Sequence, residues 1–347
     1  MKKERSSNFE LLRLLCIFGI LVMHTFAGID TTVSTQNLLL QVFCNSLFNT
    51  GVTCFVLISG YFGIRFDLAK LVRLDLMIIF FTLAGNLLLG DFGIKTLIKS
   101  CIPVISRQYW FISCYFVLCI LAPYLNQIPE KMKKEQFRTL LLVLLLIFSV
   151  IPTVTTYDIM QDAGKGLADF VMIYLIGRYL ALYCSGPLRI RRLLAGIMLS
   201  VGIIFAADGA RSLASGVIYT TFARDCSVFI IFASVLLLLL FQELRFKNGV
   251  INRAAGNVLA VYVLDGFLRA FLNRYIDWEL YAGKWYLIFL VFAYVLAVML
   301  AAILANELRK FTIGRVEPWL SERIVRLWNR LRTWLLRFAD KALAFFS

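Results

Sequence analysis

The chain has 347 residues, of which 61% are hydrophobic and 16% charged, and its mean hydropathy is +0.81. Soluble domains usually carry about 45–50% apolar and about 25% charged residues, so this composition excludes an ordinary water-soluble enzyme. The net charge of +15 is explained by basic residues in cytoplasmic loops, and no basic stretch is long or polar enough for a nucleic-acid module. We therefore expect membrane lipids around the protein and no nucleic-acid partner.

The N-terminus has the pattern of a signal peptide, since three basic residues precede an apolar run. That run, however, carries Glu10, Arg13 and His24 and lacks a cleavage site of the A-x-A type. We predict that it is retained as the first membrane helix.

Membrane-spanning helices need about 20 mainly apolar residues. About ten stretches meet this condition, of which 193–208 is the shortest. They are 9–28, 38–62, 71–90, 109–126, 139–157, 167–184, 193–208, 226–242, 256–273 and 285–306. We predict an all-α polytopic membrane helix bundle of about ten transmembrane helices, forming one domain over residues 1–315.

The loop charges support this arrangement. When the stretches alternate across the bilayer, Lys and Arg concentrate in the segments on the side of the N-terminus. Cytoplasmic loops of membrane proteins carry this excess. We therefore expect both termini in the cytoplasm.

Residues 316–347 contain too many arginines to span a bilayer. Basic residues and apolar residues recur at helical spacing on two different faces. The basic face holds Arg323, Arg326, Arg330, Arg337 and Lys341, and the apolar face holds Leu320, Ile324, Leu327, Leu331, Trp334 and Phe338. This pattern predicts a cytoplasmic amphipathic helix on the membrane surface, with partner binding as the alternative.

The eight cysteines lie mostly in apolar runs and form no C-x-x-C pair. With a single histidine in the chain, they indicate small buried side chains and no metal site.

The first helix carries the strongest candidates for chemistry. His24, the only histidine, follows Arg13 by eleven residues, and Glu10 precedes Arg13 by three. Eleven residues rotate a helix by about 1100°, or about 20° past three turns, so both side chains point the same way, about 16 Å apart. Glu10 is close enough to pair with Arg13.

These residues have structural and catalytic interpretations. Arg13 can extend to the headgroups with Glu10 as its partner, and His24 can form an interhelical hydrogen bond. A neutral imidazole is also suited to taking a proton from an attacking hydroxyl. We predict a catalytic group of His24, Arg13 and Glu10.

Three segments, in order, resemble the acyltransferase-3 family of multi-spanning membrane acyltransferases. They are NFELLRLLCIFGILVMH, with Arg13 and His24; CFVLISGYF, with Ser59, Gly60 and Tyr61; and QYWFISCYFVLCILAPYLN, with Trp110, Phe111, Tyr115 and Pro123. They lie within residues 8–125.

Two positions depart from the family pattern. The family commonly has Arg-x-x-Arg after the Ser-Gly-aromatic segment, whereas this chain has Lys70 and Arg73, and lysine lacks the bidentate fork. A late histidine of the family is replaced by Asp265. Asp265 and Arg269 are four apart and can neutralise one another, while Asp265 is also a candidate to orient His24 or bind the acceptor.

Asp208 and Arg211 are interpreted in the same way as that pair, as charges that neutralise one another.

The resemblance implies that acyl-CoA, most simply acetyl-CoA, enters from the cytoplasm. Lys70 and Arg73 would then bind its phosphates, with Ser59, Tyr61 and Trp110 as further donor-site residues. Each has a structural alternative: positive-inside anchoring, close helix packing, or the aromatic belt at the membrane interface.

We therefore expect an O-acyltransferase of the bacterial cytoplasmic membrane that modifies a hydroxyl of a surface glycan or its lipid-linked precursor. The sequence leaves open whether His24 is a general base or carries the acyl group, and whether the protein is a homo-oligomer. A transporter or flippase is the main alternative, although the absence of an internal repeat counts against it. A purely structural membrane partner would not explain the polar stripe of the first helix.

Overall fold

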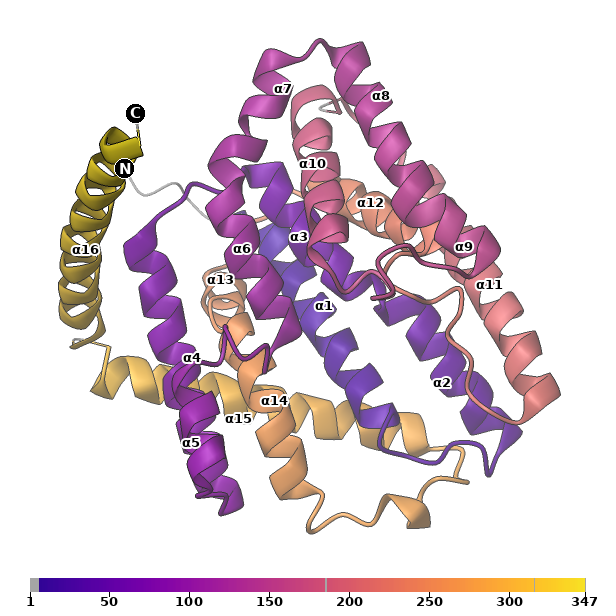
Figure 1. The fold of residues 1–347 in the computed structure, drawn as a ribbon. Coiled ribbons are helices and arrows are strands. Elements are labelled where there is room, and N and C mark those ends of the chain that lie inside the picture. The colour runs from indigo at the N-terminus through magenta and orange to yellow at the C-terminus, as the bar shows by residue number, and fades with distance from the viewer. Residues whose placement is uncertain (1–5, 185, 315, 347) are drawn as a thin grey trace.

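The computed structural model describes residues 6–184, 186–314 and 316–346, with side chains as far as Phe338 in the last helix. Within these residues the regular structure is entirely helical (Figure 1). The helices are α1 (Ser7–Phe26), α2 (Thr35–Phe48), α3 (Thr50–Phe62), α4 (Leu68–Leu89), α5 (Ile94–Cys101), α6 (Trp110–Leu125), α7 (Gln127–Lys131), α8 (Lys134–Leu145), the π-helical η1 (Leu146–Val150), α9 (Ile151–Thr155), α10 (Leu167–Tyr183), α11 (Ile190–Ser215), α12 (Val228–Glu243), α13 (Gly249–Ala255), α14 (Val258–Leu272), the 3-10 helix η2 (Trp278–Leu280), α15 (Leu287–Thr312) and α16 (Val316–Phe346).

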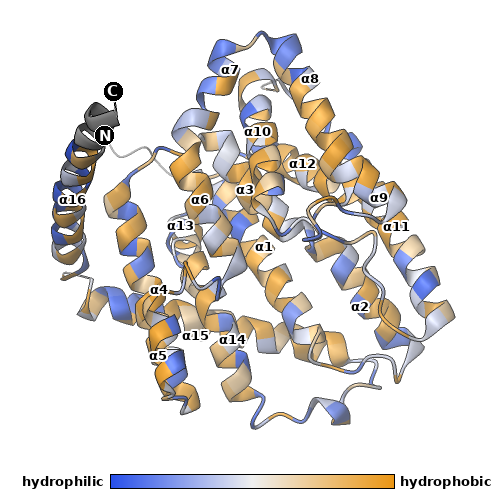
Figure 2. Cartoon of the chain, in the orientation of Figure 1, coloured by the Kyte–Doolittle hydropathy of each residue, from blue (hydrophilic) through white to orange (hydrophobic). Residues whose placement is uncertain are grey.

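Among the described residues, seven helical stretches are long and apolar enough to cross a membrane, and the bent pair α13–α14 would make an eighth. That pair bends by 54°, and α10 and α12 have only 17 and 16 residues. Hydrophobic residues cover the long helices, and hydrophilic ones gather at the α7–α8 turn (Figure 2). The predicted all-α membrane bundle is confirmed and every predicted stretch contains helix, but a total of about ten spans is not confirmed.

The predicted stretch 193–208 is too short, because α11 continues to Ser215. Asp208 is buried inside it and accepts hydrogen bonds from the backbone N–H groups of Phe222 and Ala223, at 3.0 Å each. The guanidinium of Arg211 lies 4.2 Å from the ring centre of Tyr219. Asp208 and Arg211 therefore form no direct ion pair, because the carboxylate bonds to the following loop, and their mutual neutralisation stays a prediction.

The Ser-Gly-aromatic segment brings two helices into backbone contact. A Cβ at Gly60 of α3 would collide with the backbone of Tyr174 in α10, and one at Gly177 would collide with the backbone of Leu57. Small residues permit this approach in membranes, so the structural interpretation of the segment is confirmed.

The first helix lies at the centre of the bundle (Figure 1). It contacts α2 and α3 on one side and α12, α13, α14 and α15 on others. Its largest fully buried side chains are Phe26, Leu12, Ile17 and Leu21. Burying one leucine stabilises a fold by about 1.5–3 kcal/mol relative to water, so this face fixes the position of the polar stripe beside it.

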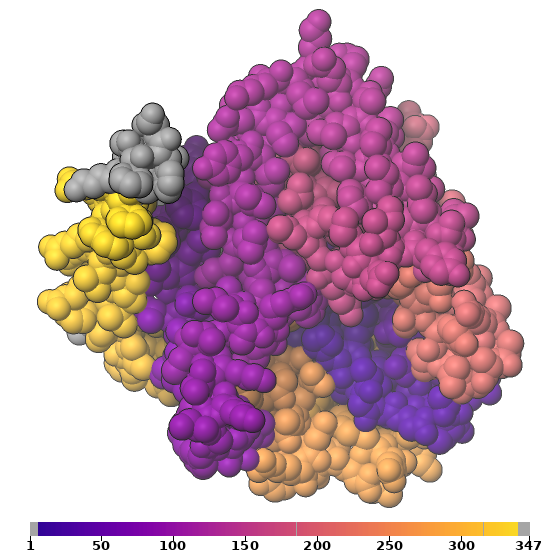
Figure 3. All heavy atoms as spheres, viewed as in Figure 1, coloured from indigo at the N-terminus to yellow at the C-terminus, as the bar shows by residue number. Residues whose placement is uncertain are grey.

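The last helix, α16, lies at the edge of the molecule (Figure 3). It contacts α4, buries Ser321, and begins with an ion pair between Arg309 and Glu317. Apolar side chains such as Leu327 and Trp334 stay exposed. The helical pattern expected for the tail is present, and its placement on the membrane surface stays a prediction.

The loop between α9 and α10 meets the loop between α11 and α12. Cys226 donates its backbone N–H to the carbonyl of Ala163 at 3.3 Å. Asp225 beside it is 3% exposed, and its Oδ1 has no hydrogen-bond partner within the described part of the chain. Burial raises the pKa of Asp225 to about 7; Lys165 lowers this pKa and Asp162 raises it. The folded protein therefore favours the protonated carboxyl.

We expect Asp225→Asn to remove a pH dependence of stability. Because the folded pKa lies above the ordinary aspartate value of 3.8, the contribution to stability is full below that value and is lost as pH rises through about 7. This loss amounts to roughly 2–3 kcal/mol between pH 5 and pH 8. Thermal unfolding in detergent at these two pH values measures it, and an equal fall in the variant would contradict the assignment.

Candidate active site

The histidine of α1 forms a hydrogen bond with an aspartate of α14. His24 Nδ1 lies 2.7 Å from Asp265 Oδ2, although the two residues are 241 positions apart in sequence. The Asp265 side chain is 3% exposed and that of His24 is 42% exposed. A buried carboxylate thus holds a partly open imidazole.

An arginine one turn further along α14 completes this group. Arg269 donates from Nε to Asp265 Oδ1 at 2.7 Å and from its NH2 group to Oδ2 at 3.0 Å. Its NH1 group donates to the backbone carbonyl of His24 at 3.0 Å. The bidentate pair neutralises the buried carboxylate, and the third bond attaches the end of α1 to α14. The expected pairing of Asp265 with Arg269 is present, together with the contact to His24.

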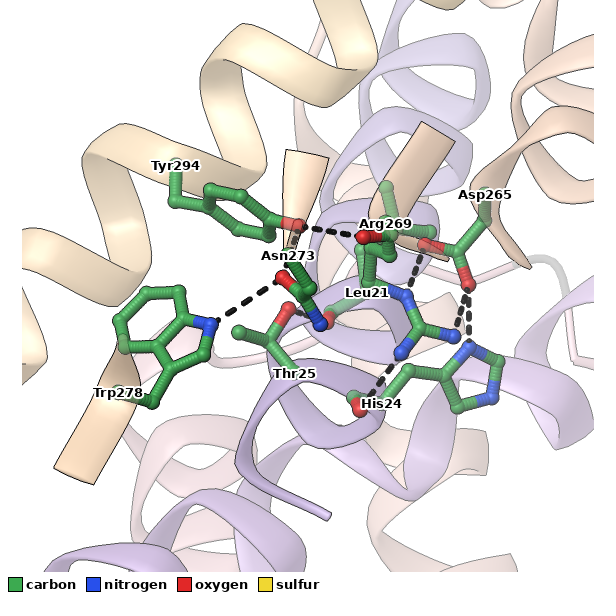
Figure 4. A network of polar contacts seen from close by, with 8 residues as sticks. All are labelled: Leu21, His24, Thr25, Asp265, Arg269, Asn273, Trp278 and Tyr294. Atoms are coloured by element: carbon green, nitrogen blue, oxygen red, sulfur yellow. Dashed lines mark hydrogen bonds and ion pairs between the residues drawn. The ribbon is translucent and has the colours of Figure 1, made fainter. Parts of the chain in front are cut away.

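Further polar contacts support the end of α14 (Figure 4). The hydroxyl of Tyr294 donates to Asn273 Oδ1 at 2.8 Å, and Trp278 Nε1 donates to the same oxygen at 3.2 Å. These bonds connect α14 to α15 and η2. The carboxylate therefore belongs to a helix that is held on several sides.

The hydrogen-bond geometry determines the tautomer of the imidazole. A carboxylate only accepts hydrogen bonds, so His24 Nδ1 carries a proton, and in the neutral imidazole Nε2 keeps its lone pair. Figure 4 shows this second nitrogen on the side of the ring away from Asp265. A histidine held by a carboxylate in this way is equipped to act as a general base, because the carboxylate orients the ring and stabilises the imidazolium that forms.

His24 and Asp265 line a cavity of about 340 Å³. We call it the histidine cavity; the residues that line it are His24, Leu89, Gln108, Tyr109, Tyr262, Val263, Asp265, Gly266, Phe267 and Arg269. Tyr109 and Gln108 precede α6, so the cavity lies between α1, α4, α6 and α14. It therefore places an open space with several polar side chains directly beside the imidazole.

A second cavity, of about 370 Å³, lies along α1 between Glu10 and Ile20. We call it the arginine cavity; it is lined by Glu10, Arg13, Ile17, Ile20, Val52, Phe55, Ser59, Leu74, Phe111, Tyr115, Ala255, Gly256, Val258, Leu259 and Tyr262. Arg13 donates to Glu10 Oε1 at 2.9 Å, and the other oxygen of Glu10 is buried without a partner among the described residues. Volumes of about 300–1,000 Å³ are typical of small-molecule sites, and mostly apolar walls with a few polar groups are typical too.

The residues predicted for the donor site fall in different places. Ser59 lines the arginine cavity, while Tyr61 packs its ring against Phe9 at 5.2 Å. Lys70 lies at the start of α4 with its ammonium 3.4 Å from Asp67. Arg73 donates from Nε to the carbonyl of Ala69 at 3.2 Å and directly precedes Leu74, which lines the cavity. Of the two predicted phosphate-binding residues, Arg73 is therefore the nearer in sequence to the cavity wall.

Trp110 lies at the other end of α6 from the turn that leads to α7. Its ring packs against Phe111 and Phe170, with centroid distances of 6.1 Å each, and the ammonium of Lys165 lies 5.9 Å from it. This packing favours the structural interpretation, and a role of Trp110 in donor binding stays a prediction.

Sequence reasoning assigned no site role to Tyr109, Phe111, Tyr115 or Tyr262, which line the two cavities. Aromatic residues in apolar helices carry no signal that distinguishes a cavity wall from a packed core.

For metals, no group of three or more His, Cys, Asp or Glu side chains suited to an ion occurs among the described residues.

Comparison with known proteins identifies the chain. The acyltransferase-3 family model, described as an acyltransferase domain, matches residues 6–312. No curated protein and no solved structure matches. Because the family match covers nearly the whole chain and the bundle is that of a membrane protein, this protein belongs to the acyltransferase-3 family of membrane acyltransferases.

Proposed function

We propose that this protein is an O-acyltransferase that moves an acyl group, most simply acetyl, from acyl-CoA to a hydroxyl of a cell-surface glycan or its lipid-linked precursor. The observation that carries the proposal is the 2.7 Å bond between His24 Nδ1 and Asp265 Oδ2 at the wall of a cavity. It leaves Nε2 as a base for a hydroxyl.

The donor would occupy the arginine cavity. Its apolar walls suit the acyl chain and the pantetheine arm, and Arg13 adds positive charge paired with Glu10. The nucleotide phosphates would bind Lys70 and Arg73 at the start of α4. The loop charges favour a cytoplasmic position for this end of the bundle, on the side where acyl-CoA is made.

The acceptor hydroxyl would lie in the histidine cavity. His24 Nε2 accepts the hydroxyl proton as the oxygen attacks the thioester carbonyl carbon. The C–S bond breaks, the acyl group remains on the oxygen as an ester, and the CoA thiolate takes the proton from the imidazolium. The products are an acyl ester and free CoA.

The place of the histidine cavity indicates on which side of the membrane the acceptor lies. The histidine cavity lies towards the outer ends of the helices under the loop-charge orientation, so the acceptor is a molecule exposed on the outer face. We propose a cytoplasmic membrane of a bacterium, with both termini inside.

Transfer of label tests the proposed function. Membranes that contain the protein, incubated with [acetyl-¹⁴C]acetyl-CoA, are expected to label envelope glycan, and membranes without the protein are not. Flux of an unmodified envelope precursor across sealed vesicles, without label in the glycan, would instead favour a transporter.

Removal of Arg73 should weaken donor binding. A hydrogen bond to a charged group contributes about 1.5–3 kcal/mol, so we expect Arg73→Ala to raise the KM for acetyl-CoA by roughly 10- to 100-fold. Acetyl-pantetheine lacks the nucleotide, and its KM should stay unchanged. The exposed Arg138 of α8 provides a matched control, since Arg138→Ala should alter neither constant. Equal effects on both donors would exclude phosphate binding by Arg73.

A further inference from the structure

One residue lines both cavities. Tyr262 belongs to the wall of the arginine cavity and to the wall of the histidine cavity. It lies in α14 between Leu259, which lines the first, and Asp265, which lines the second. The side chain therefore stands where the two cavities meet.

Three helices pass from the wall of one cavity to the wall of the other near Tyr262. Along α1, Ile20 lines the arginine cavity and His24 the histidine cavity. Around the start of α6, Phe111 lines the first and Tyr109 the second. With Tyr262 on α14, each of these elements crosses the boundary within about one helical turn.

Aromatic rings fill the boundary. The Tyr262 ring lies 5.7 Å from that of Phe111 and 6.2 Å from that of Tyr109, both as centroid distances. Tyr109 is in turn fixed by a 3.0 Å hydrogen bond between its hydroxyl and that of Thr82. Of these rings, Tyr262 alone lines both cavities within the described part of the chain, so it is the one whose removal would join them.

We propose that Tyr262 partitions the donor cavity from the acceptor cavity and sets the size of the acyl group that can pass to His24. This inference rests on the proposed function, in which the donor in the arginine cavity and the acceptor in the histidine cavity must meet across the boundary between them. The crossing leads past the ring of Tyr262. A narrow acyl group such as acetyl passes it, and branched or aromatic acyl groups are excluded.

The partition also separates the two ends of the membrane protein. If the cavities were joined, small polar species could move between them without any acyl transfer. Passive permeability is therefore a second consequence of the same residue, independent of catalysis.

Substitution of Tyr262 tests both consequences in the reconstituted full-length protein. The donors are acetyl-CoA, isobutyryl-CoA and benzoyl-CoA, with envelope glycan as the acceptor and released CoA thiol as the readout. Tyr262→Ala should raise the rate ratio of isobutyryl to acetyl transfer by about tenfold or more, as expected when a steric term of about 1.4 kcal/mol is removed. Tyr262→Phe keeps the ring and should keep the wild-type ratio. Leu268→Ala is the matched control, because Leu268 is a partly buried apolar residue of the same helix that lines neither cavity.

Proton flux into vesicles that trap a pH-sensitive dye provides the second readout. Vesicles with Tyr262→Ala should equilibrate faster than those with wild type, Tyr262→Phe or Leu268→Ala. An unchanged donor ratio with retained acetyl transfer would overturn the proposal, as would an impermeable Tyr262→Ala vesicle. If no donor releases CoA even with wild type, the proposed function fails, and the flux measurement still decides the partition. Tyr262→Leu, a milder change, serves if the alanine variant does not fold.

Discussion

His24→Gln is expected to reduce acyl transfer by roughly 10³-fold, the range in which a positioned general base contributes. Glutamine can still donate a hydrogen bond to Asp265, so the contact between α1 and α14 is retained. What the variant loses is the Nε2 lone pair that takes the hydroxyl proton. Transfer of labelled acetyl into envelope glycan, at matched amounts of membrane protein, measures the effect.

A neighbouring substitution provides the control for His24→Gln. Thr25 follows His24 and bonds its hydroxyl to the carbonyl of Leu21 in the same helix, so Thr25→Ser should keep full activity. The KM for acetyl-CoA should change by less than about twofold in His24→Gln, because the arginine cavity is unaltered. Full transfer by the glutamine variant would rule out His24 as the base. A labelled acetyl group trapped on wild-type His24 without acceptor would assign it a nucleophilic role instead.

Asp265→Asn is expected to lower kcat by roughly 10²–10⁴-fold with little change in the KM for acetyl-CoA. Arg269 donates to the side-chain oxygen, which leaves the amide nitrogen of the asparagine to face His24. That nitrogen only donates, so the imidazole proton must move from Nδ1 to Nε2. The nitrogen beside the acceptor would then have no lone pair.

A structural explanation of the same loss can be tested separately. Removing one partner of a buried ion pair costs about 3–5 kcal/mol because the other charge stays buried. The double variant Asp265→Asn with Arg269→Gln should therefore recover thermal stability but not activity. Asp225→Asn replaces another buried aspartate, outside both cavities, and should leave kcat unchanged. Recovery of activity in the double variant would show that Asp265 acts only through stability.

Local properties of the sequence predicted much of the fold. Apolar length determines where a bilayer helix can form, and loop charge determines its expected direction. The structure contains helix in every predicted stretch, and the close contact at Gly60 follows from the absence of a side chain. The 54° bend between α13 and α14 and the extension of α11 to Ser215 were not predicted, because they depend on contacts with distant segments.

For the site, the sequence by itself determined the stripe of Glu10, Arg13 and His24, because the spacing on one helix depends only on helical geometry. Only the tertiary structure decided that His24 meets Asp265, a residue 241 positions later. The distance between side chains on different helices depends on how those helices pack, which spacing along the chain does not contain. The role of Tyr262 could not be predicted for the same reason. An aromatic residue in an apolar helix becomes a partition only when the packing of other helices leaves a cavity on each side of it.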